Sequence, residues 1–144
     1  MTQEAAKIAG VPAIAVSRAQ GKFLSLEVLR MQATRILKAG APAGYSAIWT
    51  ALALLAQGRL VTPEIDRTQA EIARANTENP RLDNVVDVRQ GAALEILAKL
   101  EVPSFELCFI DADKEKAPPV LSTLTGCRGK ARSSLSTTWC AMAR

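Results

Sequence analysis

Hydrophobic and polar positions along the chain divide it into two kinds of segment. Short apolar runs at residues 35–39, 59–62, 85–89 and 105–110 have the length and composition of buried strands. Segments with helical spacing lie at residues 45–56, 66–79 and 92–100, and further helices are predicted over residues 2–9 and 18–32. Strands that alternate with helices of this length are typical of βαβ units, so the pattern predicts an α/β fold with a parallel sheet.

Two of the predicted helices have clear start signals and predicted buried faces. Ser17 is suited to cap the helix over residues 18–32, in which Phe23, Leu26, Leu29 and Arg30 recur at helical spacing, as expected of a helix that lies against the sheet. Asp66 is suited to cap the polar helix over residues 66–79. Its predicted inward residues are Ala70, Ile72, Ala73 and Ala75.

The turn after the first strand carries two glycines, Gly40 and Gly44. Glycines let the backbone approach a ligand there, and the helix that follows offers free N–H groups. Glu64 ends the second strand about 20 residues beyond Gly44, the usual offset for an acid that binds a ribose hydroxyl. A nucleoside cofactor is therefore the first hypothesis. The alternative, in which the glycines only end a strand and start a helix, stays open.

A charged cluster of Asp111, Asp113 and Lys114 follows the fourth strand. Since α/β sheets bind ligands beyond the carboxyl ends of their strands, we expect the cluster to face the same crevice as Gly40. Asp111 is suited to a hard divalent cation, and Lys114 could serve as a general base for a substrate hydroxyl. The alternative is a solvated turn in which Asp113 caps the next helix.

Composition excludes several kinds of chemistry. The chain has no histidine, which excludes Ser-His-Asp catalysis, Cys-His catalysis and histidine metal sites within it. Its three widely spaced cysteines indicate neither a disulfide framework nor a thiolate zinc site. No apolar stretch is long enough to span a bilayer, and residues 1–10 lack a secretory apolar core, so we expect a cytoplasmic protein without a membrane partner.

The net charge of +4 is concentrated in the tail. The basic residues after Thr125, with no acid among them, are Arg128, Lys130, Arg132 and Arg144. A nucleic-acid-binding arm is one interpretation. Few aromatic residues and no recognisable binding module argue against it, so no nucleic-acid partner is expected.

Four motifs occur in a set order at residues 11–22 (VPAIAVSRAQGK), 44–49 (GYSAIW), 58–66 (GRLVTPEID) and 109–115 (FIDADKE). Together they resemble the bacterial O-methyltransferases related to caffeoyl-CoA and catechol O-methyltransferases, over about residues 4–124. The resemblance implies the Rossmann-like class I methyltransferase fold, with helices on both faces of a parallel sheet, and S-adenosylmethionine as the cofactor. It also implies methyl transfer to a hydroxyl of a small catechol-like or other phenolic acceptor, with a divalent, magnesium-like metal. The family is commonly dimeric, so the resemblance allows a homodimer.

The resemblance also implies roles for individual residues. The positions that match the cofactor-lining residues of the family are Val16, Gly40, Ala41, Ser46 and Ala93. Glu64 would take the ribose hydroxyls, and Asp113 would also contact the cofactor. Asp111 matches a metal ligand, and Lys114 matches the lysine with which catechol-type members deprotonate the attacking hydroxyl.

Departures from the family bear on activity. Lys38 stands where the family has a cofactor-binding glutamate, and a cation is unsuited to a sulfonium ligand. After residue 125, a Ser/Thr/Arg-rich stretch without strand alternation replaces the family's fifth strand and its Asp-Asn metal motif. We therefore predict an incomplete cofactor-binding domain over residues 1–125, truncated after the fourth strand, and a disordered basic tail over residues 126–144. The fourth strand would keep an exposed edge.

Alternative functions follow from these departures. With an incomplete metal site, weak or absent catalysis is expected, so an inactive cofactor-binding fragment is the alternative to an active enzyme. An NAD-binding Rossmann domain is less favoured because residues 40–44 lack the full glycine pattern of a dinucleotide site.

The codons permitted for residues 127–144 allow another interpretation of the tail. In a shifted reading frame, each triplet consists of the last base of one codon and the first two bases of the next. In that frame, the codons of Trp139 and Cys140 can only give a valine. A permitted codon choice over the whole stretch yields LSRKGTVIVVDNVVRDGA, which matches the strand and metal motif that the family has there. We therefore hypothesise a frameshift near residues 124–126. Codons in the nucleotide sequence that are incompatible with the shifted reading would end the hypothesis.

Overall fold

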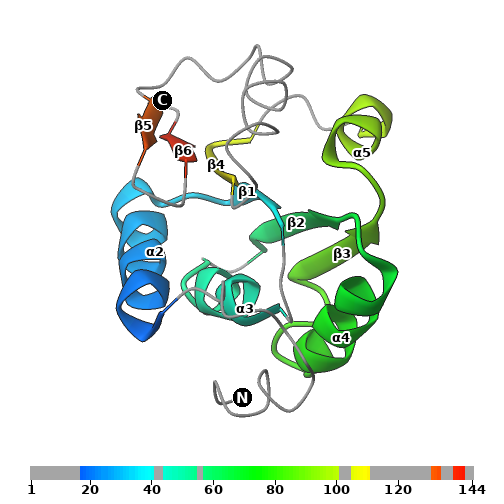
Figure 1. Cartoon of the computed structure of the whole chain (residues 1–144). Helices are drawn as coiled ribbons and strands as arrows, with labels where there is room; N and C mark the ends of the chain where they lie inside the picture. The colour runs from blue at the N-terminus through cyan, green and yellow to red at the C-terminus, as the bar shows by residue number, and fades with distance from the viewer. Residues whose placement is uncertain are drawn as a thin grey trace.

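The computed structural model describes residues 17–40, 44–54, 57–100, 105–110, 131–133 and 138–141 (Figure 1). Within these ranges the helices are α2 (Arg18–Met31), α3 (Tyr45–Leu52), α4 (Arg67–Thr77) and α5 (Ala93–Lys99). The strands are β1 (Arg35–Ala39), β2 (Arg59–Glu64), β3 (Val86–Gln90), β4 (Leu107–Ile110), β5 (Ala131–Ser133) and β6 (Thr138–Ala141). The helix predicted over residues 2–9 lies outside the described residues.

One sheet organises the molecule, with the strand order β3-β2-β1-β4-β6-β5. The pairs β2–β3, β1–β2 and β1–β4 are all parallel, so the four strands predicted from the apolar runs form the predicted parallel sheet. β1 lies at the centre of these four, between β2 and β4. Helix α5 covers one face of the sheet, and α2, α3 and α4 lie on the other (Figure 1). The predicted α/β fold with helices on both faces is confirmed.

Alternating side chains of the central strands fill two apolar layers, as the two-residue repeat of a strand requires. Ile36, Leu60 and Phe109 belong to the cluster that packs against α2 and α3. Leu37 and Val61 belong to the cluster that packs against Leu97 of α5 and its neighbours. Both faces of the parallel strands are therefore buried, which accounts for the nearly continuous apolar runs in the sequence.

The start of α2 agrees with its prediction, but its buried face does not. The Ser17 hydroxyl accepts a hydrogen bond from the Gln20 N–H at 3.2 Å, and the Gln20 side chain accepts one from the Ser17 N–H at 2.8 Å, which makes a capping box. The predicted inward residues Phe23, Leu26 and Leu29 are instead 46–54% exposed. The buried residues are Gly21, Leu24 and Val28.

A close contact explains which face of α2 is buried. A Cβ atom added to Gly21 would lie 2.6 Å from Cδ1 of Trp49 on α3, so the two helices approach at a residue that has no side chain. Helical spacing alone did not reveal this, because both stripes of α2 recur at helical intervals. In α4 the Asp66 cap is confirmed, since Asp66 Oδ1 accepts from the Gln69 N–H at 2.8 Å. The buried residues of α4 are Ala70, Ala73 and Thr77, whereas Ala75 is exposed.

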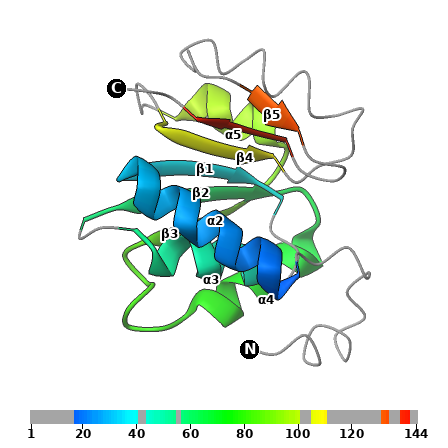
Figure 2. The same ribbon diagram turned by 90° about the vertical axis from the view of Figure 1, so that its left-hand side faces the viewer.

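The tail contributes two strands that the sequence did not predict. Strand β6 pairs antiparallel with β4, with Thr138 opposite Ile110 and Ala141 opposite Leu107, and β5 pairs with β6. Figure 2 shows β6 (red) beside β4 (yellow). The expectation that β4 keeps an exposed edge, with no strand in the tail, is therefore wrong. Backbone groups of an edge strand can pair with any extended segment, so side-chain alternation is a poor guide to such pairing. The domain boundary at residue 125, and disorder elsewhere in the tail, stay predictions.

Candidate functional site

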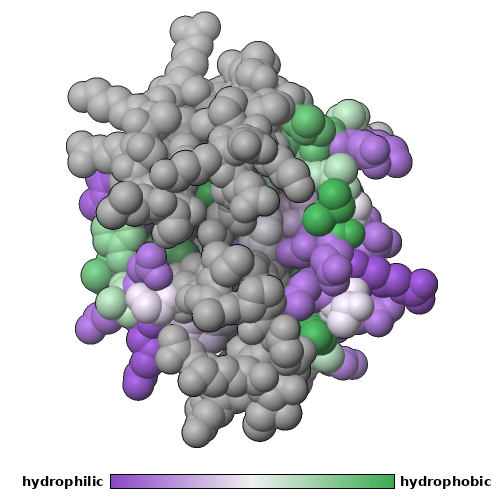
Figure 3. All heavy atoms as spheres, viewed as in Figure 1, coloured by the Kyte–Doolittle hydropathy of each residue, from purple (hydrophilic) through white to green (hydrophobic). Residues whose placement is uncertain are grey.

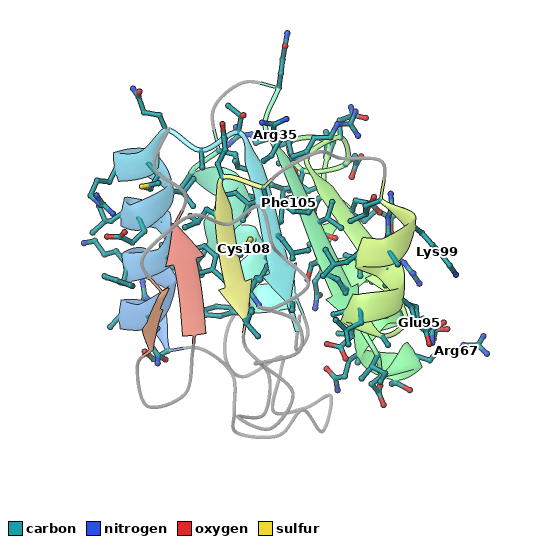
Figure 4. The ribbon with its side chains drawn as sticks, turned by 90° about the horizontal axis from the view of Figure 1, so that it is seen from above. Arg35, Arg67, Glu95, Lys99, Phe105 and Cys108 are labelled. Carbon is teal, nitrogen blue, oxygen red and sulfur yellow. The ribbon has the colours of Figure 1, made fainter. Side chains whose placement is uncertain are left out.

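The carboxyl ends of β1, β2 and β3 are joined by backbone hydrogen bonds. The Gly40 N–H donates to the Pro63 carbonyl at 3.0 Å, and the Gly91 N–H donates to the Glu64 carbonyl at 2.9 Å. Gly40, Glu64 and Gly91 therefore lie at one edge of the sheet, where ligands of parallel α/β sheets bind. Arg35, labelled in Figure 4, marks the opposite, amino end of β1. The structure thus brings the glycine turn and Glu64 to the same edge, and the predicted convergence with Asp111 and Lys114 stays a prediction.

Positive backbone angles at the glycine turn explain why glycine stands there. Gly40 has φ of 85° and Gly44 has φ of 75°, a region that side chains disfavour. Gly44 is also the N-cap of α3, and a Cβ atom there would lie 3.2 Å from Cα and the carbonyl oxygen of Ala73 in α4. Gly44 has no side chain, so no side-chain hydrogen bond caps the first backbone N–H groups of α3.

Glu64 brings a carboxylate to the same edge. It is the last residue of β2, with 9% of the residue exposed, and its Oε1 accepts a hydrogen bond from the Asp66 N–H at 3.0 Å. This bond offsets part of the cost of burying a carboxylate and fixes its orientation. Glu64 is therefore a pre-positioned acceptor for hydroxyl groups.

Two more predicted cofactor residues lie in the elements that follow these strands. Ser46, in the first turn of α3, is buried, and Ala93, which begins α5 shortly after Gly91, is half-buried. The structure thus brings the elements that carry Gly40, Ser46, Glu64 and Ala93 to one edge. Five other predicted site residues lie outside the described residues, namely Val16, Ala41, Asp111, Asp113 and Lys114.

The position of the last residue of β4 is known, and the predicted charged cluster of Asp111, Asp113 and Lys114 follows it in the sequence. Ile110, the last residue of β4, pairs with Ala39 of β1, so β4 ends level with the residue that precedes Gly40. The residue that follows Ile110 in the sequence is Asp111. The roles of Asp111 in metal binding, of Asp113 in cofactor binding and of Lys114 in catalysis stay predictions.

A metal site cannot be built from the described residues alone. Among them, no group of three or more His, Cys, Asp or Glu side chains is placed to hold a metal ion. The predicted magnesium-like site at Asp111 therefore stays a prediction. No helix in the same ranges is both long and apolar enough to cross a membrane.

Lys38 is a buried cation whose burial the sequence analysis did not predict. It is 1% exposed, and its Nζ donates a hydrogen bond to the carbonyl oxygen of Gly40. It shares a face of β1 with Ile36, whose neighbours are apolar. One signal could have revealed this burial: a lysine inside an apolar strand that is buried on both faces must itself be buried.

Comparison with known proteins identifies relatives of this chain. Residues 1–123 match the family model described as O-methyltransferase. The catechol O-methyltransferase of Niastella koreensis is 47% identical over 109 residues, which are 74% of this chain and 49% of that protein. The catechol O-methyltransferase of Mycobacterium tuberculosis is 45% identical over 111 residues, which are 77% of this chain and 50% of that protein. The chain thus spans about half the length of these curated relatives.

A solved structure shares the fold. The O-methyltransferase of Bacillus cereus, crystallised with SAH, superposes with a TM-score of 0.81 at 39% identity, covering 86% of this chain and 58% of that one. A structure described as a putative O-methyltransferase of Klebsiella pneumoniae has a TM-score of 0.74 at 28% identity, covering 97% of this chain and 87% of that one.

Proposed function

This chain belongs to the O-methyltransferase family, and we propose that it binds S-adenosylmethionine at the carboxyl edge of β1 and β2. We further propose that the methyl group goes to a hydroxyl of a small catechol-like or other phenolic acceptor. The catechol O-methyltransferases among the relatives, and the SAH-bound structure of the Bacillus cereus protein, support this proposal.

The observation that carries the proposal is the position of the Glu64 carboxylate beside the Gly40 turn. A carboxylate accepts two hydrogen bonds readily, and a ribose offers two adjacent hydroxyl donors. The positive φ at Gly40 favours a residue without a side chain, so the backbone of the turn is bare at the edge where a nucleoside would bind. These residues fit the nucleoside part of the cofactor.

Methyl transfer would need two contributions from the chain. The first is positioning, because holding the acceptor oxygen in line with the methyl carbon supplies much of the rate enhancement in such reactions. S-adenosylmethionine would supply the methyl group, and it would leave as a neutral thioether as the acceptor oxygen bonds to the methyl carbon. The second contribution is a base for the hydroxyl proton, and Lys114 is the residue whose sequence match predicts that role.

Calorimetry with S-adenosylhomocysteine tests the cofactor assignment. We expect Glu64→Gln to weaken binding by about 10- to 100-fold, since charged hydrogen bonds of about 1.5–3 kcal/mol are replaced by weaker ones. Glu71→Gln is the matched control, because Glu71 is an exposed carboxylate on α4 paired with Arg67. The same measurement with NAD in place of S-adenosylhomocysteine distinguishes the proposed cofactor site from an NAD-binding Rossmann domain. Tight binding of NAD alone, or equal effects of the two substitutions, would contradict the proposal.

An inactive cofactor-binding fragment remains the second candidate, and Lys38 favours it because a buried cation lies next to the Gly40 turn. Transfer of a labelled methyl group to catechol separates the two candidates. Weak or absent transfer by a chain that binds S-adenosylhomocysteine would support the fragment, whereas turnover at the rate of a full-length relative would support the enzyme.

A further inference from the structure

The two cysteines of the described strands lie opposite each other. Cys108 belongs to β4 and Cys140 to β6, and the antiparallel register of these strands pairs the two residues directly. Figure 4 labels Cys108 on β4, the strand next to β6. Residues 109–139 separate the two cysteines in the sequence, so their spacing gave no sign of this pairing. The register of the strands therefore makes them candidates for a covalent link.

The backbone geometry of an antiparallel pair suits a disulfide. Directly opposed residues lie on the same face of the sheet, with Cα atoms about 4.5–5.5 Å apart, and disulfides join Cα atoms about 4.4–6.8 Å apart. The Cβ atoms of opposed residues are about 4.5–5.5 Å apart, so a disulfide requires them to approach by about 1 Å. Strand β6 has four residues and its outer neighbour β5 has three, so only a short stretch of backbone has to shift.

The position of Cys108 is set by the parallel part of the sheet. Cys108 pairs with Leu37 of the central strand, is fully buried, and belongs to the apolar cluster that includes Val61 and Phe105. The structure describes it as a thiol. Burial keeps this sulfur away from the cysteines of other chains, so a link within the chain is favoured over a link between two chains. A residue directly opposite in β6 is the kind of partner that such a position allows.

We propose that Cys108 and Cys140 form a disulfide that joins β6 to the parallel sheet under oxidising conditions, with glutathione disulfide as the oxidant. The thiolate of one cysteine attacks a sulfur of the oxidant, which forms a mixed disulfide and releases one glutathione thiol. The other cysteine then attacks the mixed disulfide and releases the second glutathione. The protein loses two protons and two electrons, and the two glutathione thiols take them up. An excess of reduced glutathione reverses the reaction.

The disulfide and the fold stabilise each other. The link closes a loop over residues 109–139, which carries the predicted site residues Asp111, Asp113 and Lys114. Closing a loop of about 30 residues removes conformational freedom from the unfolded chain and so raises the stability of the folded one. By linkage, the folded chain favours the disulfide over the two thiols by the same factor. The proposal does not depend on the proposed cofactor site.

A redox titration of the full chain tests the proposal. The chain is equilibrated at set ratios of reduced to oxidised glutathione, quenched with acid and digested without reduction, and mass spectrometry measures the linked peptides. The same titration is repeated in urea that unfolds the chain. Cys127→Ser is the matched control, because it removes the third cysteine and leaves the opposed pair intact. Cys140→Ser removes the pair without changing the buried Cys108, and circular dichroism shows whether each variant is folded.

We expect monomers in which Cys108 is joined to Cys140, with an equilibrium constant for oxidation about 100-fold or more larger in the folded chain than in urea. The midpoint of thermal unfolding should be about 10 °C higher for the oxidised chain than for the reduced one. Both effects should persist in Cys127→Ser, and the difference in midpoint should vanish in Cys140→Ser. Two thiols that stay reduced in excess oxidised glutathione, a link to Cys127 instead, or equal equilibrium constants with and without urea would overturn the proposal.

Discussion

Single residues at the carboxyl edge of the sheet have backbone and charge requirements that can be tested separately. Gly44 combines a left-handed backbone with a 3.2 Å approach to the backbone of Ala73. Glu64 lies in a position where its burial has to be offset by hydrogen bonds. The requirement at Gly44 concerns stability, and that at Glu64 concerns binding, so substitutions there should have different effects.

We expect Gly44→Ala to lower the free energy of unfolding by about 2 kcal/mol, because alanine adds both backbone strain and a contact that backbone atoms cannot relieve. Chemical denaturation measures the change. Gln57→Gly is the reciprocal control, since Gln57 has φ of 68° with a side chain present. It should leave stability unchanged or raise it by about 0.5 kcal/mol. A Gly44→Ala variant as stable as the unmodified chain would contradict the account of the turn.

The sequence indicated Glu64 and missed the burial of Lys38, for a physical reason. The position of Glu64 follows from local spacing, because a strand, a turn and a helix of ordinary length place the end of the second strand beside the first turn. The burial of Lys38 follows from packing over both faces of β1, which the apolar residues around it indicate, whereas its hydrogen bond to Gly40 depends on the conformation of the turn, which no local pattern encodes. The hydrogen bond from Lys38 to Gly40 was therefore found only in the structure.

At the scale of the elements, the contact of α2 with α3 depends on Gly21, which packs against the large side chain of Trp49. Gly21 lies against the ring of Trp49, the Ser25 hydroxyl donates to the Trp49 carbonyl at 2.7 Å, and Tyr45 meets Trp49 edge to face at 6.5 Å. Trp49 thus joins the two helices through its ring and its backbone. This contact, rather than the hydrophobicity of Phe23, Leu26 and Leu29, decides which face of α2 is turned toward the protein interior.

We expect Gly21→Ala to destabilise the chain by about 1–3 kcal/mol, although alanine favours a helix by about 1 kcal/mol, because the new methyl group would overlap the indole. The cost should shrink when Trp49 is replaced by leucine, which gives room to the methyl group. Chemical denaturation of the two single variants and the double variant measures this coupling. Additive effects of the two substitutions would show that the helices do not meet at Gly21.

At the scale of the whole molecule, β6 covers the edge of β4 that the sequence predicted to be open. The four parallel strands were predictable because each is a distinct apolar run followed by turn and helix signals. The order of those strands and the antiparallel addition of β6 were not, because pairing between distant segments depends on backbone groups that every extended sequence carries. Figure 3 shows apolar surface on the side where α2 lies, and the exposed apolar residues of α2 are Phe23, Leu26 and Leu29. A homodimer stays a prediction.

Removal of residues 126–144 should expose the edge of β4 and promote self-association, since an unpaired strand is a template for pairing with other chains. Sedimentation velocity on the full and the shortened chain at equal concentration measures the change. We expect larger species to grow with concentration in the shortened chain only. Identical sedimentation of the two chains would mean that β6 does not protect the edge in solution.

The central claim is that the carboxyl edge of β1 and β2 holds the nucleoside of S-adenosylmethionine or of its demethylated product. A crystal structure of the chain with S-adenosylhomocysteine tests this most directly. The account predicts ribose hydroxyls within hydrogen-bonding distance of the Glu64 carboxylate and the ligand against the backbone of Gly40. A nucleoside bound elsewhere on the chain, with Glu64 making no contact to it, would contradict the claim.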